Sequence, residues 1–235
     1  MKKFLTLLLA AAFMLSASVL SSCDDADDII EDAIDAGDDI YVTITNGNIV
    51  LAYEDVDLKD TDGDGALTVN DALYLAHQEK YNGGTAAGFA SEMTDYGLSL
   101  TKLWGNESGS FGYTVNNTSA MSLAEPVKAG DHVVAYVYTD TVAWSDTYCF
   151  FDKAELEINE NTSFTLTLKM NTYDAEWNTV QAPVGGARIT INGITTDYVT
   201  DADGKVTLSL ADDAIISAVS DTMTLVPPIC SVDVD

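Results

Sequence analysis

Residues 40–53 read IYVTITNGNIVLAY, and this stretch decides the fold of the first half of the chain. Apolar residues alternate with polar ones on both sides of Asn46-Gly47, at positions 40, 42 and 44 and again at 49, 51 and 53. Asn-Gly favours a tight hairpin turn, because both central turn positions adopt a positive φ. The sequence therefore predicts a β-hairpin whose second strand continues through Val56 and Leu58.

A helix is predicted from Val69 to Tyr81. Thr68 and Asp71 form a capping-box pattern at its start, and Gly83-Gly84 ends it. A loop of small residues is expected next. Further strands are expected at 99–104, 112–115 and 132–138. A hairpin, one helix and then more strands indicate an α+β domain, which we place at residues 40–150.

The rest of the chain, residues 151–235, has a different pattern. It contains short runs of strand-forming residues that are separated by Gly, Asp and Asn turns, at 155–158, 164–170, 187–191, 206–210, 215–219 and 230–234. No helix is needed to account for them. An all-β sandwich is the predicted architecture of this second domain.

The first 22 residues have the pattern of a secretory signal peptide. Two lysines precede an apolar run at 4–15, which is too short to span a bilayer, and small residues follow it. The stretch Leu20-Ser21-Ser22-Cys23 resembles the lipobox of bacterial lipoproteins, in which the cysteine is lipidated and becomes the new N-terminus. The resemblance implies a surface lipoprotein anchored through Cys23 to the cell membrane or outer membrane. The alternative is an ordinary secreted protein with a spare thiol.

Negative charge limits the possible partners. Removal of residues 1–22 takes away two lysines and no acid, which leaves 38 acids against 8 basic residues and a formal charge of −30. Such a charge argues against nucleic acid as a partner and favours cation binding. Residues 23–39 are the most acidic part and are interpreted as a disordered, solvated tether. The alternative is a segment that binds cations weakly and without fixed geometry.

Two further cysteines, Cys149 and Cys230, lie in apolar surroundings. If Cys23 carries lipid, they form an even pair in a compartment where disulfides persist. A disulfide between them would close a long loop and stabilise the fold by roughly 4 kcal/mol. The alternative is two buried free thiols.

Residues 60–71 read DTDGDGALTVND and carry the one chemically specific motif. A hard divalent cation takes about seven oxygen ligands, and a calcium loop supplies them from positions 1, 3, 5, 7, 9 and 12. Gly65 occupies the sixth position, where the chain turns sharply. The spacing predicts a calcium site whose ligands are Asp60, Asp62, Asp64, the backbone carbonyl of Ala66, Thr68 and Asp71.

Aspartate at the twelfth position departs from the common EF-hand pattern and resembles the calcium loop of dockerin domains. The resemblance covers the twelve loop residues and the following helix. A second loop of this kind is missing, so a cohesin-binding dockerin is not expected. The predicted role of calcium is to tie the strand to the helix. The alternative is an acidic turn that caps the helix without a metal.

A second pattern follows the helix. It consists of Trp104-Gly105, the run 112–116 (GYTVN) and Gly-Asp at 130–131 before a strand. Together with the apolar helix at 72–76, it resembles the transcobalamin C-terminal-like, β-grasp-related domain of unknown function in bacterial surface proteins. The resemblance covers about residues 40–140 and implies a β-grasp-like fold. It also raises corrinoid binding as an alternative function, although the helical domain that supplies much of the corrinoid contact in that family is missing.

Residues 183–193 (PVGGARITING) and 200–208 (TDADGKVTL) resemble the carboxypeptidase-regulatory or Ig-like modules of bacterial surface proteins. Such modules usually serve as spacers or adhesive sandwiches. The resemblance therefore implies a structural or adhesive second domain.

The leading functional hypothesis is a non-enzymatic extracellular module that binds a small molecule, a glycan or a protein. Aromatic side chains suit sugars and planar ligands, so Trp104 and Tyr113 are the candidate platform, with Trp144 and Trp177 as further candidates. The alternative for each is that it fills a small β core.

An enzyme, or an accessory protein of a secreted hydrolase, is the other class of function. A Ser or Cys nucleophile needs a base, and the chain has only His77 and His132. Neither lies in a hydrolase or metalloprotease motif. Paired acids are too common in this chain to indicate a glycosidase, so no catalytic residue is predicted.

Overall fold

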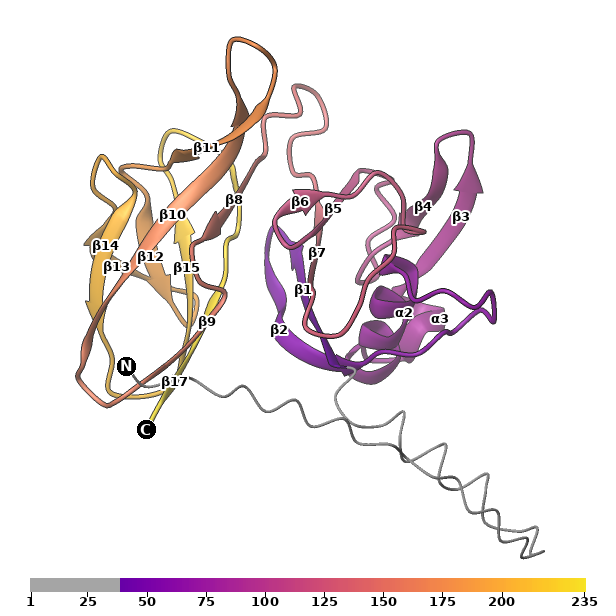
Figure 1. Cartoon of the computed structure of the whole chain (residues 1–235), viewed down its shortest axis with the longest axis horizontal. Helices are drawn as coiled ribbons and strands as arrows, with labels where there is room; N and C mark the ends of the chain where they lie inside the picture. The colour runs from indigo at the N-terminus through magenta and orange to yellow at the C-terminus, as the bar shows by residue number, and fades with distance from the viewer. Residues whose placement is uncertain (1–38) are drawn as a thin grey trace, which may run out of the picture. The chain divides into compact units, whose positions relative to one another are not determined.

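The predicted hairpin at Asn46-Gly47 is confirmed, but of the two residues only Gly47 adopts a positive φ, of 75°. Asn46 does not occupy the left-handed region expected for it; it is the last residue of a strand and pairs with Asn48. The hairpin joins β1 (Asp39–Asn46) to β2 (Asn48–Asp57) as an antiparallel pair. The computed structural model describes residues 39–235 (Figure 1). The predicted signal peptide, Cys23 and the tether up to residue 38 lie outside the described residues.

Strand β1 lies between β2 and β7 in a mixed sheet of order β2-β1-β7-β5-β6. The other strands are β5 (Phe111–Val115), β6 (Thr118–Ser119) and β7 (His132–Val137), and β1 runs parallel to β7. Both faces of β1 are buried, because Thr43 and Thr45 on the second face are as inaccessible as the isoleucines on the first. The Thr43 hydroxyl is satisfied there by the backbone N–H of Tyr53 and the ring of His132.

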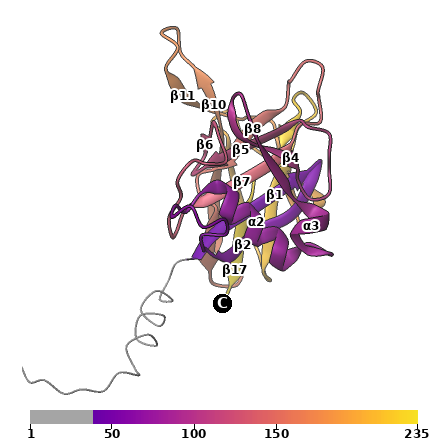
Figure 2. The same ribbon diagram turned by 90° about the vertical axis from the view of Figure 1, so that its right-hand side faces the viewer.

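The predicted helix is confirmed as α2 (Val69–Lys80), with Thr68 as N-cap and both hydrogen bonds of the capping box. Its buried face packs with β1 and β7 in one hydrophobic cluster, which includes Val69, Ala72, Leu73, Ala76, Ile40, Val42, Ile44 and Val133. Figures 1 and 2 show α2 on one face of this sheet. Within residues 39–235, no helix is long and apolar enough to cross a membrane.

The segment expected as a small-residue loop instead forms α3 (Gly84–Gly88) and the start of β3 (Ala90–Thr94), which pairs with β4 (Gly97–Lys102). Close packing requires a small residue at Gly88, whereas Ala86 and Ala87 are exposed. A Cβ atom at Gly88 would lie 2.6 Å from the Tyr81 ring and 3.0 Å from the His77 ring. Glycine at this position therefore lets α3 approach the C-terminal end of α2.

The remaining residues form two further sheets. The first has the order β11-β10-β8-β16, with β14 also paired to β10, and the second has the order β13-β12-β15-β17-β9. One hydrophobic core joins the two sheets, with Leu166 and Leu168 from one and Ile189 and Ile216 from the other. The strands are β8 (Thr147–Phe151), β9 (Glu155–Ile158), β10 (Ser163–Tyr173), β11 (Thr179–Pro183), β12 (Arg188–Ile191), β13 (Ile194–Val199), β14 (Lys205–Ser209), β15 (Ala214–Val219), β16 (Leu225–Val226) and β17 (Cys230–Val234).

The boundary between the two sets of sheets differs from the one expected at residue 150. Strand β8 pairs with β10 and β16, so residues 147–151 belong to the second set, and the connection runs through residues 138–146. Hydrogen bonds join the two sets. The Thr114 hydroxyl donates to the Tyr148 hydroxyl (3.1 Å), which donates to the Asn117 side-chain oxygen (2.9 Å).

Cys149 and Cys230 are two buried free thiols in the structure, and no disulfide joins them. The Cys149 thiol donates to the carbonyl oxygen of Val226 (3.3 Å), and the Cys230 thiol donates to that of Ser231 (3.8 Å). Both side chains fill the second core as small apolar groups. Burial raises the pKa of each thiol to about 12.

These thiols should not react with a disulfide reagent at pH 8 in the folded protein, because the thiolate is the reactive form. In protein carrying Cys23→Ser, two thiols per chain should react with the reagent in guanidinium without reductant, and almost none in native buffer. If no thiol reacts in guanidinium until the protein has been reduced, Cys149 and Cys230 are oxidised to a disulfide.

Both histidines are buried and neutral. The His77 ring is hydrogen bonded through Nδ1 to the Leu73 carbonyl (2.6 Å), and its Nε2 accepts from the backbone N–H of Trp104 (3.0 Å). His132 Nε2 lies 2.9 Å from the Thr43 hydroxyl. Burial lowers the pKa of each ring to about 4.

Acid should therefore destabilise the fold through the histidines. The unfolded rings protonate below about pH 6.5 and the folded rings only near pH 4, so their contribution is complete above pH 6.5 and is lost as pH falls toward 4. Each histidine should contribute on the order of 3 kcal/mol to this loss. Histidine Cε1 proton shifts followed by NMR should stay constant from pH 8 to 5. A ring that titrates near pH 6.5 in the folded protein would contradict this expectation.

Candidate metal centre

The loop at residues 58–68 joins β2 to α2 and carries the predicted calcium ligands. Leu58 at one end and Thr68 and Val69 at the other are buried, so both ends of the loop are fixed. Gly63 and Gly65 adopt φ values of 78° and 85°. Positive φ at these positions turns the exposed loop sharply, as predicted for Gly65 at the sixth position.

The Asp71 carboxylate is fully buried at the start of α2. Its Oδ1 accepts from the backbone N–H and the hydroxyl of Thr61, at 2.8 and 2.6 Å. Its Oδ2 accepts from the backbone N–H and the hydroxyl of Thr68, at 2.9 and 2.6 Å. One carboxylate therefore connects the beginning of the loop to the helix N-cap.

Asp60 organises the exposed part of the loop. Its two oxygens accept from the backbone N–H groups of Gly63 (2.7 Å) and Gly65 (2.8 Å). The Gly65 and Gly63 N–H groups hold the pKa of Asp60 below its ordinary value, because they stabilise the charged form. Asp60 therefore remains an anion that faces the loop interior.

Asp62 receives fewer hydrogen bonds from the loop than Asp60 or Asp71. It accepts one backbone hydrogen bond, from Asp64 at 3.2 Å. That N–H lowers the pKa of Asp62, but desolvation and the charges of Asp64, Asp71 and Asp60 outweigh it, so the pKa is raised. The carboxylate of Asp62 is thus repelled by three neighbouring carboxylates.

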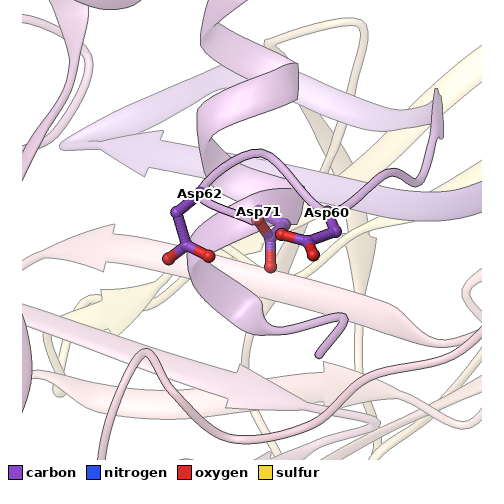
Figure 3. Close-up of side chains that lie close together, drawn as sticks. All are labelled: Asp60, Asp62 and Asp71. Atoms are coloured by element: carbon purple, nitrogen blue, oxygen red, sulfur yellow. The ribbon is translucent and has the colours of Figure 1, made fainter. Parts of the chain in front are cut away.

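The structure brings three of the six predicted ligands together. One oxygen each from Asp60, Asp62 and Asp71 lies within 4.8 Å of the others, and Figure 3 shows the three side chains around the loop. The Asp64 carboxylate instead accepts from the backbone N–H of Ala66 (2.8 Å). The Thr68 hydroxyl is directed to Asp71.

Thr61 contributes to the candidate site in a way that the ligand spacing did not indicate. It occupies the second loop position and donates both its N–H and its hydroxyl to Asp71. A carboxylate offers about four lone-pair sites, so Thr61 and Thr68 together occupy those of Asp71. A metal ion would share Asp71 with these donors only after a threonine hydroxyl rotates away.

The predicted aromatic platform is mostly part of the core. Trp104 and Tyr113 are half-buried and pack against the first hydrophobic cluster. The Trp104 ring also contacts the His77 ring, with centroids 5.2 Å apart. Trp144 and Trp177, by contrast, are 55% and 82% exposed. Exposed aromatic surface is therefore found at the further candidates rather than at the pair predicted first.

Comparisons of the chain with protein-family models, with curated proteins and with solved structures give no match.

Proposed function

We propose that the chain is a non-enzymatic cell-envelope lipoprotein whose folded part is an extracellular ligand-binding or adhesion module stabilised by calcium. The observation that carries the proposal is the convergence of Asp60, Asp62 and Asp71 within 4.8 Å at the junction of β2 and α2. The lipid anchor at Cys23 rests on the N-terminal sequence pattern alone.

The topology supports the finer fold assignment that we propose for each half. Helix α2 follows the β1–β2 hairpin, and the later strand β7 runs parallel to β1 in the middle of the sheet, as in a β-grasp-like domain. In the second half, one core between two sheets supports an Ig-like β-sandwich.

A non-enzymatic role is supported by the histidines. His77 has both ring nitrogens engaged, and His132 is buried with a lowered pKa. A general base needs an accessible lone pair and a pKa near the working pH. Neither histidine offers both.

Calcium fits the chemistry of the triad better than a softer metal, because every available donor is an oxygen. The charges of Asp60, Asp62 and Asp71 repel one another, and a divalent cation would convert that repulsion into attraction. Asp62 has the most unused acceptor capacity of the three, since it accepts a single hydrogen bond. It would therefore be the ligand most dependent on the ion.

Calcium should raise the melting temperature relative to chelator. A site of the affinity typical of extracellular modules, at about 10 mM calcium, should raise it by about 3–10 °C. Magnesium should give a smaller rise, because it tolerates irregular oxygen geometry poorly. Coincident melting curves in calcium and in chelator would remove calcium from the proposal.

Two matched variants separate a metal site from an acidic helix cap that needs no metal. Asp62→Asn should abolish the calcium-dependent rise, yet leave the melting temperature in chelator unchanged or higher, because it removes repulsion. Thr61→Val should lower the melting temperature in chelator by removing a hydrogen bond to Asp71, while the calcium response remains. If Asp62→Asn retains the full response to calcium, the ion binds elsewhere.

A further inference from the structure

A cleft of about 850 Å³ lies between the β1–β2 turn and the outer face of the sheet formed by β13, β12 and β15. Asn48 and Ile49 line one wall, and Thr190, Thr195 and Ser217 line the other. This volume is in the range of small-molecule sites. Of the residues in 39–235 that line it, none has a charged side chain, although 20% of the chain is charged.

The wall formed by the sheet carries a row of three hydroxyl groups. Thr190 on β12 is the direct cross-strand partner of Thr195 on β13 and of Ser217 on β15. Side chains paired in this way lie on one face of a sheet, about 5 Å apart. The row therefore presents one hydroxyl from each of three neighbouring strands to the same space.

These hydroxyls have no protein partner. Thr190 and Ser217 are each only 7% exposed, and their side chains form no hydrogen bond within the described part of the chain. Neither oxygen is sealed from solvent, since residues 39–235 contain no inaccessible side-chain oxygen without a partner. A nearly buried hydroxyl that opens only toward a cleft is free to bond a ligand or water there.

The lining also limits the charge of the ligand. A charged group placed in the cleft would lose water without meeting an opposite charge, which is unfavourable. An anion is further repelled by the net charge of −28. Ile49, Ile215 and Met223 add apolar surface beside the hydroxyls. The cleft therefore suits a neutral molecule that has both hydroxyl and C–H faces.

We propose that this cleft binds a neutral carbohydrate, with Thr195, Thr190 and Ser217 bonding its hydroxyl groups and the Asn48 amide closing over it from the β1–β2 turn. The inference rests on the proposed ligand-binding function and names its ligand class. It does not depend on the metal centre, because Asp60, Asp62 and Asp71 are not among the residues that line the cleft.

The test is an NMR titration of the purified protein carrying Cys23→Ser. The probes are neutral hexoses, N-acetylhexosamines and their oligosaccharides, with uronic and sialic acids as charged counterparts. A neutral sugar should shift the methyl resonances of Thr190 and Thr195, and the charged sugars should not. No shift of these methyl groups by any neutral sugar at millimolar concentration, or stronger binding of the charged sugars, would overturn the proposal.

Matched variants locate the binding. Thr190→Val and Ser217→Ala should each raise the sugar Kd about fivefold to tenfold, the cost of one hydrogen bond. Thr179→Val and Ser163→Ala make the same changes at exposed positions outside the cleft and should leave Kd unchanged. Equal melting temperatures would show that the variants fold.

Two outcomes distinguish this proposal from the broader one. Sugar binding that survives Thr190→Val but is lost in Trp177→Ala would overturn the assignment of the cleft as the sugar site, while the proposed ligand-binding function would stand. A calcium response without any sugar binding would overturn the proposal of a sugar site in the cleft, while the proposed calcium site would stand.

Discussion

The buried carboxylate of Asp71 is the constraint on which the first half of the molecule depends. It accepts four hydrogen bonds, two from Thr61 where the loop begins and two from the N-cap Thr68. A negative charge at the first turn of a helix is stabilised by the helix dipole and by these donors. The same group therefore starts α2, closes the loop and holds β2 against the helix that covers the sheet.

Sequence patterns predicted the elements of the fold that are determined by residues close together in the chain. The hairpin and the Thr68–Asp71 capping box depend on neighbouring residues, and both are present, although only Gly47 of the Asn46-Gly47 pair adopts the expected positive φ. The parallel pairing of β1 with β7 joins residues about ninety positions apart, and no local pattern encodes it. Strands β11 and β13 were missed because they are largely exposed and lack apolar alternation.

In the candidate site, too, the sequence predicted what depends on the spacing of residues and missed what depends on side-chain conformation. Spacing alone located Asp60, Asp62 and Asp71, which the structure brings together. Spacing could not show that Asp64 would turn to its own backbone, nor that Thr61 would reach Asp71, because both depend on side-chain conformation within the folded loop. The sequence predicts Trp104 as part of a ligand platform, whereas its contacts with His77 place it at the edge of the core.

The acidic composition has a structural explanation at several turns. Asp140 and Asp174, like Asp60, accept backbone N–H groups of their own loops. The Ser145 hydroxyl and then backbone N–H groups lower the pKa of Asp140, and the Asn178 side chain and then backbone N–H groups lower the pKa of Asp174. Such aspartates stabilise turns and need no ligand. Asp62 differs, because the Asp64 N–H cannot offset its desolvation and the neighbouring charges. Hydrogen bonds within the loop satisfy Asp60 and Asp71, whereas the exposed Asp62 accepts a single one and is repelled by its neighbours, so the like charges of the loop are least offset at Asp62.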